Sequence, residues 1–123
     1  MVLLEYMARM DGQNPEKALE YVEPDFRFLI ALPGGQVSGQ SREDFARYIT
    51  GREAVERVHN VLRSAVDGNV EMVYGVVTES GRPTGAFHSA AVVSANGRML
   101  RYQSFFTTSF ELLDWPAAPG SEG

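Results

Sequence analysis

The sequence predicts an α+β fold, a cone-shaped barrel in which a strongly bent mixed or antiparallel sheet wraps around three N-terminal helices. Three observations support this prediction. Helical spacing of apolar residues is confined to the first part of the chain, up to residue 50, and strand-like segments then follow as two hairpins over residues 58–79 and 85–110. Gly39, Gly75 and Gly85 lie where such a sheet would bend or bulge. A sheet bent in this way would leave a pocket with one open mouth.

The composition indicates one ordinary globular domain. The chain has 123 residues, of which 44% are hydrophobic and 22% are charged, and such values are typical of a folded domain with a sizeable core. We predict a single domain over residues 1–115. Residues 116–123, in which Pro, Gly and Ala dominate, are predicted to form a disordered tail.

Charge and residue content argue against several kinds of partner. The net charge is −5 and the arginines are spread along the chain, so neither nucleic acid nor an anionic membrane is an expected partner. With no cysteine and only two histidines, no disulfide, thiolate nucleophile or metal site is expected. No apolar run approaches the ~20 residues of a membrane span, and no signal peptide is expected. We therefore expect a cytoplasmic protein.

Two helices are expected at the start of the chain. Apolar residues recur at spacings of three to four residues over Val2–Met10 and predict the first helix. Asn14 and Pro15 suit the N-cap and the first position of a second helix. Pro24 would end that helix.

A strand and a third helix are expected next. Aromatic and branched residues over Asp25–Leu32 predict the strand, with which residues 36–40 could pair back. Ser41 is followed three residues later by Asp44, which resembles a capping box and predicts the start of a helix. Gly51 would interrupt this helix.

The first predicted hairpin decides which way His59 points. Its strands cover residues 58–66 and 70–79 and are joined by a tight turn. If the turn has two residues, His59 lies on the face that we expect to point inward. The other residues of that face would be Val61, Arg63, Met72, Tyr74 and Val76, with Arg63 at the rim of the cavity. A three-residue turn with a bulge would reverse the direction of His59.

The second predicted hairpin is the expected back wall of a ligand pocket. Asn96-Gly97 is typical of a type I′ turn, and such a turn sets the register of the two strands. The pairs on one face would be Phe87 with Phe106, Ser89 with Ser104, Ala91 with Tyr102 and Val93 with Leu100. Because this face mixes large rings with small and hydroxyl side chains, it suits a cavity wall better than a packed core. His88 would lie on the opposite face, at the surface or in a dimer interface.

Short segments along the chain together resemble a known superfamily. They are Tyr6-Met7-Ala8-Arg9-Met10 with Leu19-Glu20-Tyr21-Val22, Asp25-Phe26-Arg27-Phe28, Gly39-Gln40-Ser41-Arg42-Glu43-Asp44-Phe45, Val58-His59-Asn60-Val61 with Asp67-Gly68-Asn69, and Asn96-Gly97-Arg98-Met99-Leu100-Arg101-Tyr102. In this order they resemble the nuclear-transport-factor-2-like superfamily, in its SnoaL-like polyketide cyclase and ketosteroid-isomerase-like branches. The resemblance implies a cone-shaped α+β barrel with an apolar cavity, and a homodimer built on the outer face of the sheet.

The resemblance matches one functional residue of the isomerase branch but none of its acids. Tyr6 fits the tyrosine that, in the isomerase branch, donates a hydrogen bond to the developing oxyanion. The position of the branch's carboxylate base falls near Ile30, and the positions of two further acids fall at Ser89 and Ser104. Ketosteroid isomerisation of the family type is therefore not expected, because a neutral site lacks the base that takes a proton from a carbon acid.

His59 is the remaining candidate for proton transfer, because histidine exchanges protons near neutral pH. The resemblance implies that dehydratase-like branches use a histidine here beside a tyrosine and an aspartate. The alternative is a histidine whose ring is satisfied by a backbone carbonyl. If the protein is an enzyme, we predict His59 and Tyr6 as its catalytic residues. The predicted ligand-binding residues are Tyr48, Met72, Tyr74, Ser89, Ala91, Tyr102, Ser104 and Phe106.

Two functions follow from these observations, and the sequence does not decide between them. In the first, a small apolar, polyketide- or steroid-like molecule binds in an internal pocket and undergoes cyclisation, isomerisation or dehydration by proton transfer, without a cofactor. In the second, the protein is a non-enzymatic module for ligand carriage or dimerisation. A pocket that holds Tyr6, His59 and a second ionisable group would favour the first.

Overall fold

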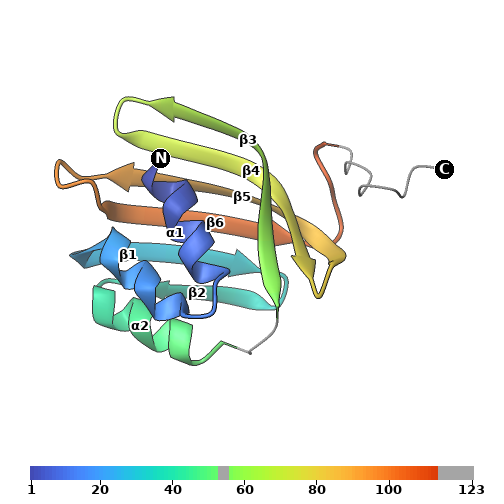
Figure 1. Ribbon diagram of the computed structural model, residues 1–123, viewed down its shortest axis with the longest axis horizontal. Coiled ribbons are helices and arrows are strands. Elements are labelled where there is room, and N and C mark those ends of the chain that lie inside the picture. The colour runs from blue at the N-terminus through green and yellow to red at the C-terminus, as the bar shows by residue number, and fades with distance from the viewer. Residues whose placement is uncertain (53–55, 114–123) are drawn as a thin grey trace.

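The computed structural model describes residues 1–52 and 56–113 (Figure 1). The described residues form three helices and one six-stranded mixed sheet, which confirms the predicted α+β fold. The helices are α1 (Val2–Met10), the 3-10 helix η1 (Pro15–Tyr21) and α2 (Arg42–Thr50); the strands are β1 (Val22–Leu32), β2 (Gly35–Gly39), β3 (Arg57–Asp67), β4 (Val70–Glu79), β5 (Arg82–Val93) and β6 (Met99–Thr107). The end of the predicted domain and the tail predicted over 116–123 lie outside the described residues.

The sheet has the strand order β2-β1-β6-β5-β4-β3. Strands β1 and β6 are parallel, and the remaining neighbours are antiparallel. In the described part of the chain β2 and β3 are edge strands, so the bent sheet forms an open cone. Helices α1 and α2 lie on the same side of the sheet (Figure 1). This face, which carries the core and is called the inner face below, therefore lies between sheet and helices.

The core is built around aromatic rings from both helices and from the sheet. The ring centroids of Phe28 and Phe45 are 4.9 Å apart, and those of Phe26 and Phe45 are 5.3 Å apart, both with edge-on geometry. Tyr6 meets Tyr102 in the same way at 5.2 Å. Such edge contacts stabilise aromatic pairs beyond their buried area. This cluster therefore fixes α1 and α2 against β1 and β6.

The beginnings of the three helices differ from one another. Ser41 caps α2 as predicted, because its Oγ accepts a hydrogen bond of 3.0 Å from the Asp44 backbone N–H. Asn14 makes no such bond, and the second predicted helix is a 3-10 helix that begins at Pro15. Its chain passes directly into β1 at Val22, so Pro24 does not end the helix but lies within the strand. The register of β1 against β6 is interrupted between Val22 and Arg27, where Pro24 can be accommodated without a ladder hydrogen bond.

The start of α1 is held by a residue from the sheet. No side chain at the N-cap of α1 makes a capping bond. Instead, Oε1 of the buried Glu71 accepts a 2.8 Å hydrogen bond from the backbone N–H of Leu3. A carboxylate at this end of a helix also interacts favourably with the helix dipole. Glu71 thus fastens α1 to β4.

The second hairpin has the predicted register over most of its length. Phe87 pairs with Phe106, Ser89 with Ser104 and Ala91 with Tyr102, as expected, and these residues face inward. At the turn the prediction was wrong, because Val93 pairs with Met99 instead of Leu100. The connection is a longer turn in which Ser94 N–H donates to the Arg98 carbonyl, and only Gly97 has a positive φ. The Ser94 hydroxyl accepts from the Asn96 and Arg98 amides, which stabilises this turn over type I′.

The first hairpin corrects the predicted neighbours of His59. Its loop has two residues, since Asp67 pairs with Val70, but a bulge interrupts the register between Val61 and Arg63. The bulge leaves Arg63 on the outer face and turns His59 inward, opposite Val77. Met72, Tyr74 and Val76 therefore lie on the face opposite to His59, and the prediction that they share its face was wrong.

Gly75 explains why the bulge occurs at this point. A Cβ atom at Gly75 would lie 2.2 Å from the Asn60 carbonyl oxygen and 2.9 Å from the Phe87 ring. Real carbon atoms do not approach this closely, so only glycine allows β3 to pass β4 here. Gly85 has a similar place beside the irregularity between β4 and β5, where a Cβ would meet the Thr107 carbonyl oxygen at 2.3 Å. Both glycines lie at bends, as predicted.

Candidate functional site

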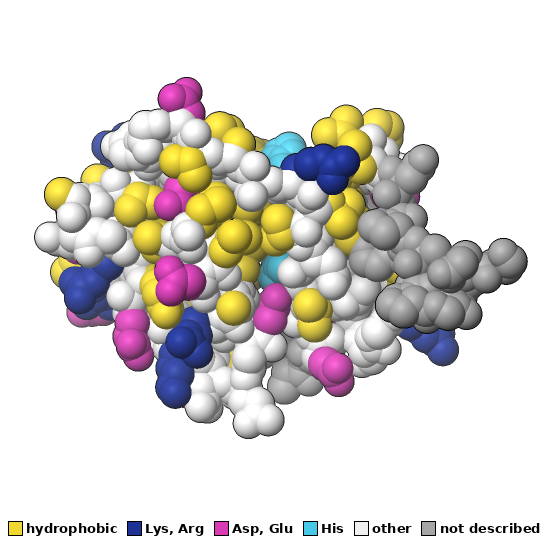
Figure 2. All heavy atoms as spheres, turned by 45° about the horizontal axis from the view of Figure 1, so that its top comes forward, with side chains coloured by type: hydrophobic (Ala, Val, Ile, Leu, Met, Phe, Trp, Pro, Cys, Tyr) yellow, Lys and Arg dark blue, Asp and Glu magenta, His cyan; other side chains and the backbone are white. Residues whose placement is uncertain are grey.

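A pocket of about 460 Å³ lies between the helices and the inner face of the sheet. This volume suits a small organic ligand. Most of its lining is apolar and comes from α1, β1, β2 and the strands β4 to β6: Met7, Met10, Ile30, Leu32, Val37, Val77, Phe87 and Phe106. Figure 2 shows that hydrophobic side chains also gather across the middle of the face drawn there, with Lys and Arg toward its margin. A larger and shallower hollow of about 850 Å³ contains neither Tyr6 nor His59 in its lining.

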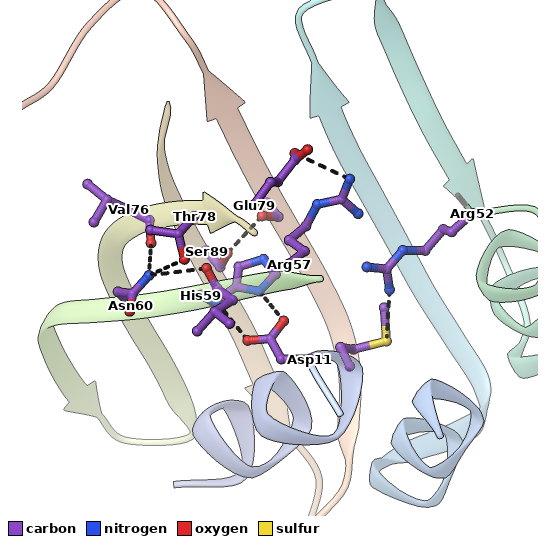
Figure 3. A network of polar contacts seen from close by, with 12 residues as sticks. Asp11, Arg52, Arg57, His59, Asn60, Val76, Thr78, Glu79 and Ser89 are labelled. Carbon is purple, nitrogen blue, oxygen red and sulfur yellow. Dashed lines mark hydrogen bonds and ion pairs between the residues drawn. The ribbon is translucent and has the colours of Figure 1, made fainter. Parts of the chain in front are cut away.

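His59 reaches this pocket from β3 and is held there by Asp11 (Figure 3). Its Nδ1 lies 2.7 Å from Oδ1 of Asp11, and its backbone N–H donates to Oδ2 of the same carboxylate, also at 2.7 Å. The two side chains are only 20% and 13% exposed. Since a carboxylate accepts hydrogen bonds, it fixes the proton of a neutral imidazole on Nδ1 and leaves Nε2 as an acceptor, which has no partner among residues 1–52 and 56–113.

The surroundings of His59 fix the plane of its ring. The ring meets Phe87 edge-on, with centroids 4.9 Å apart. Because the hydrogen-bonding partner of Nδ1 is a carboxylate, the alternative of a ring satisfied by a backbone carbonyl does not apply. Asp11 was not among the residues predicted for the site. A signal was present, because the resemblance implied an aspartate beside the histidine.

Tyr6 and Tyr102 form the deep wall of the pocket. Both are buried, and burial is the main cause that raises the pKa of each hydroxyl; for Tyr6 the neighbouring Tyr102 and Tyr48 add to the effect. The two hydroxyls therefore stay protonated near neutral pH and are available as hydrogen-bond donors.

The other predicted ligand contacts divide into three groups. Tyr48, Tyr102, Ser104 and Phe106 line the pocket together with Tyr6 and His59. Ser89 and Ala91 are buried on the same inner face but do not line the pocket. Met72, 40% exposed, and Tyr74 lie on the outer face, where the Tyr74 hydroxyl accepts a 2.7 Å hydrogen bond from Leu112 N–H.

The two hairpin serines bind each other. Their Oγ atoms are 2.8 Å apart, and Ser89 Oγ is also 3.5 Å from the Tyr102 hydroxyl. Both serines are buried. The pair thus satisfies its own hydrogen bonds, with Ser104 as the member that borders the pocket.

Charged residues that the sequence interpretation did not single out stand around the pocket. Arg47, Arg52, Arg57 and Glu79 belong to its lining. Arg57 pairs with Glu79 at 3.4 Å, and Arg47 pairs with Asp44. They lie on α2, just after it, on β3 and on β4, so they come together only in the folded chain and no local sequence pattern marks them.

The arrangement of helices and sheet matches solved structures. A proposed isomerase of the SnoaL-like family from Agrobacterium tumefaciens superposes with a TM-score of 0.72 at 12% identity, covering 86% of this chain and 94% of its own. A proposed ketosteroid isomerase from Kribbella flavida gives 0.72 at 18% identity, over 95% and 88% of the two chains. A proposed polyketide cyclase from Sinorhizobium meliloti gives 0.64 at 20% identity, over 84% and 92%. The chain has the nuclear-transport-factor-2-like fold.

The sequence itself carries no comparable match. No family model matches it, and no curated protein is significantly similar to it. The nuclear-transport-factor-2-like fold therefore rests on the three-dimensional arrangement. No helix among the described residues is long and apolar enough to cross a membrane. In the same part of the chain, no group of three His, Cys, Asp or Glu side chains is placed to hold a metal ion.

Within the nuclear-transport-factor-2-like fold, the acid positions discussed above are neutral in this chain. Ile30 is buried in the pocket lining, and Ser104 is the polar residue nearest to it along the paired strand. The histidine and the charged side chains that reach the pocket lie instead on β3 and β4 and near the end of α2. Any proton transfer in this pocket must use that side of it.

Proposed function

We propose that the protein binds a small apolar, polyketide- or steroid-like molecule in this pocket and moves a proton on it without a cofactor. The observation that carries the proposal is the His59–Asp11 pair, which stands at the wall of a largely apolar pocket. Cyclisation, isomerisation and dehydration are the reactions that such a pair can serve. The likeness in fold to SnoaL-like and ketosteroid-isomerase-like proteins supports this class.

In this proposal His59 is the general base and afterwards the general acid. Nε2 takes a proton from a carbon beside a carbonyl group of the ligand, while Asp11 holds the ring and stabilises the imidazolium that forms. The same Nε2–H can then return the proton to another carbon, or give it to a departing hydroxyl group. The apolar lining excludes water and strengthens these interactions.

Tyr6 has the complementary role. Its buried hydroxyl stays protonated, because burial raises its pKa, and it donates a hydrogen bond to the carbonyl oxygen as negative charge develops there. Tyr102 lies beside it, with ring centroids 5.2 Å apart, and orients the ligand together with Ser104. Ile30 supplies no base, so the proposal differs from ketosteroid isomerisation of the family type.

The proposal can be tested with 5-nitrobenzisoxazole, a neutral aromatic probe. A base that takes its C3 proton breaks the N–O bond and releases a coloured nitrophenolate. We expect the protein to accelerate this elimination, and we expect His59→Gln to reduce the rate by about 100-fold, within the range attributed to general-base catalysis. His88→Gln is the matched control, because His88 is exposed on the outer face.

The outcomes separate the two functions. Loss of the rate in His59→Gln and not in His88→Gln supports catalysis by His59. Equal rates in the unmodified protein and in both variants would contradict catalysis by His59. That result would favour the ligand-carrying module, which the mutual hydrogen bond of Ser89 and Ser104 also supports. Native mass spectrometry of the purified protein would then reveal a retained apolar ligand.

The outer face of the sheet is our proposed site of homodimerisation. It exposes Met72 and Phe105, which are 40% and 37% accessible. Phe105 also lines a surface groove together with Tyr74, Phe110 and Leu112. Exposed apolar groups of this kind are typical of interfaces. Light scattering should give twice the monomer mass, and Phe105→Glu should lower it; a monomer in the unmodified protein would contradict the proposal.

A further inference from the structure

The charge of the pocket lining is opposite to that of the whole chain. The chain has 16 acidic and 11 basic residues, yet the pocket lining contains Arg47, Arg52 and Arg57 and only one carboxylate, Glu79. Arg47 and Arg57 already have acidic partners in Asp44 and Glu79. Arg52 therefore differs from the other two.

Arg52 has only weak partners among the described residues. One terminal nitrogen lies 3.6 Å from the sulfur of Met10, and the guanidinium carbon lies 5.8 Å from the centre of the Tyr48 ring. Its Nε is screened from solvent and makes no hydrogen bond within the described chain. A buried donor without an acceptor is energetically unfavourable. Arg52 belongs to the pocket lining, so an oxygen ligand there can accept hydrogen bonds from its terminal nitrogens.

We propose that the ligand of this pocket carries a carboxylate, which Arg52 binds. The flat guanidinium fork matches a carboxylate through two parallel hydrogen bonds, and Tyr48 and Met10 hold the fork in place from uncharged surfaces. Because Arg52 has no acidic partner among residues 1–52 and 56–113 and its pocket is mainly apolar, the fitting ligand is a monoanion on an apolar body. The inference rests on the pocket of the proposed function and names its substrate class.

The position of Arg52 limits the size of the ligand. Arg52 contacts Met10, and His59 is bonded to the next residue, Asp11. Figure 3 shows both side chains approaching the same end of α1, Arg52 from the side of α2 and His59 from β3. A compact acid can therefore reach Arg52 with its carboxylate and His59 with a carbon of its ring system.

Paired probes test the charge preference. 2-Naphthoate and 2-naphthamide share their shape and differ in charge, and isothermal titration calorimetry measures both. We expect the unmodified protein to bind the acid at least about 10-fold more tightly, as a charge-assisted pair would. Arg52→Gln should reduce this ratio to less than about 3-fold. Arg101→Gln, on the exposed outer side of β6, removes the same charge and should leave the ratio unchanged.

Further variants keep the two proposals distinguishable. His59→Gln should retain the preference for naphthoate although it loses proton transfer. Arg52→Lys, which keeps the positive charge without the fork, should show an intermediate ratio and serves if Arg52→Gln does not fold. Equal binding of acid and amide by the unmodified protein, or an unchanged ratio in Arg52→Gln, would overturn the carboxylate inference alone. Failure of both probes to bind would overturn the ligand pocket and both proposals with it.

Discussion

Asp11 and His59 are joined by two hydrogen bonds of 2.7 Å although 48 residues separate them in the chain. One carboxylate oxygen holds the ring and the other holds the backbone of the same histidine. The end of α1 and the inner side of β3 are thereby fixed to each other at the pocket wall. This relationship converts an isolated histidine into one with a defined ring orientation and a defined proton position.

Asp11→Asn should reduce the elimination of 5-nitrobenzisoxazole at least about 10-fold, because an amide that turns its NH₂ toward Nδ1 favours the wrong tautomer of the imidazole. Initial rates measured by nitrophenolate absorbance check this. Asp25→Asn removes one negative charge at an exposed position and should have the rate of the unmodified protein. Full activity of Asp11→Asn would show that the carboxylate does not position His59.

Glu71→Ala should lower the free energy of unfolding by about 1–3 kcal/mol, because it removes the acceptor of the buried Leu3 amide. Glu71→Gln should cost less, since its amide oxygen can still accept that bond. Urea denaturation followed by circular dichroism gives both values. Glu20→Ala, at an exposed position of η1, is the comparison. If all three variants unfold at the same urea concentration, Glu71 does not anchor α1.

Glu23 should make stability depend on pH in the acidic range. Hydrogen bonds from Ser94 and Asn96 lower the pKa of its carboxyl, with burial acting in the opposite direction. Because the folded pKa lies below the unfolded value of about 4.3, the ionised group stabilises the fold above that value. This contribution is lost as the pH falls through the folded pKa.

The measurement for Glu23 is a pH series of unfolding free energies for the unmodified protein and Glu23→Gln. The difference between the two should be largest near neutral pH and should shrink as the pH falls below 4. Asn96→Ala removes one of the two donors to Glu23. Its pH-dependent loss of unfolding free energy should lie between that of the unmodified protein and that of Glu23→Gln. A difference that stays constant over the series would contradict the lowered pKa of Glu23.

Ser89 and Ser104 should show strong coupling in a double-mutant cycle. Each single change to Ala leaves the other buried hydroxyl without its 2.8 Å partner, at a cost of about 1–2 kcal/mol. The double change removes both hydroxyls and should cost less than the sum of the two single changes. Thermal denaturation of the four proteins gives the coupling energy, and strictly additive effects would exclude a direct bond between the serines.

The inner face of the second hairpin could be predicted because alternation along a strand depends on a period of two. Phe87, Ser89 and Ala91 therefore face inward opposite the predicted partners. The turn could not be predicted from Asn96-Gly97 alone, because the Ser94 hydroxyl competes by accepting two backbone amides. Local side-chain bonding here outweighs the preference of the dipeptide.

The candidate site was predicted only in part, for a similar reason. His59 points inward because of a bulge, and that bulge depends on the missing side chain of Gly75 in the neighbouring strand. Asp11 at the end of α1 meets His59, and Arg52 just after α2 lines the pocket, only in the folded chain, which short-range patterns do not encode. Conversely, Tyr6 and Tyr102 were predicted to line the pocket, because each follows the periodicity of its own element.

The parallel pairing of β1 with β6 has a consequence for synthesis of the chain. β1 ends at Leu32, but its neighbour β6 extends to Thr107. The β1–β6 ladder can therefore form only after nearly the whole described chain has been synthesised. During translation, at roughly 5–20 residues per second, the apolar side of β1 remains without that partner for several seconds. Until β6 is made, β2 is the neighbour available to β1, and the short β1–β2 hairpin with α2 against it is the unit able to shield β1.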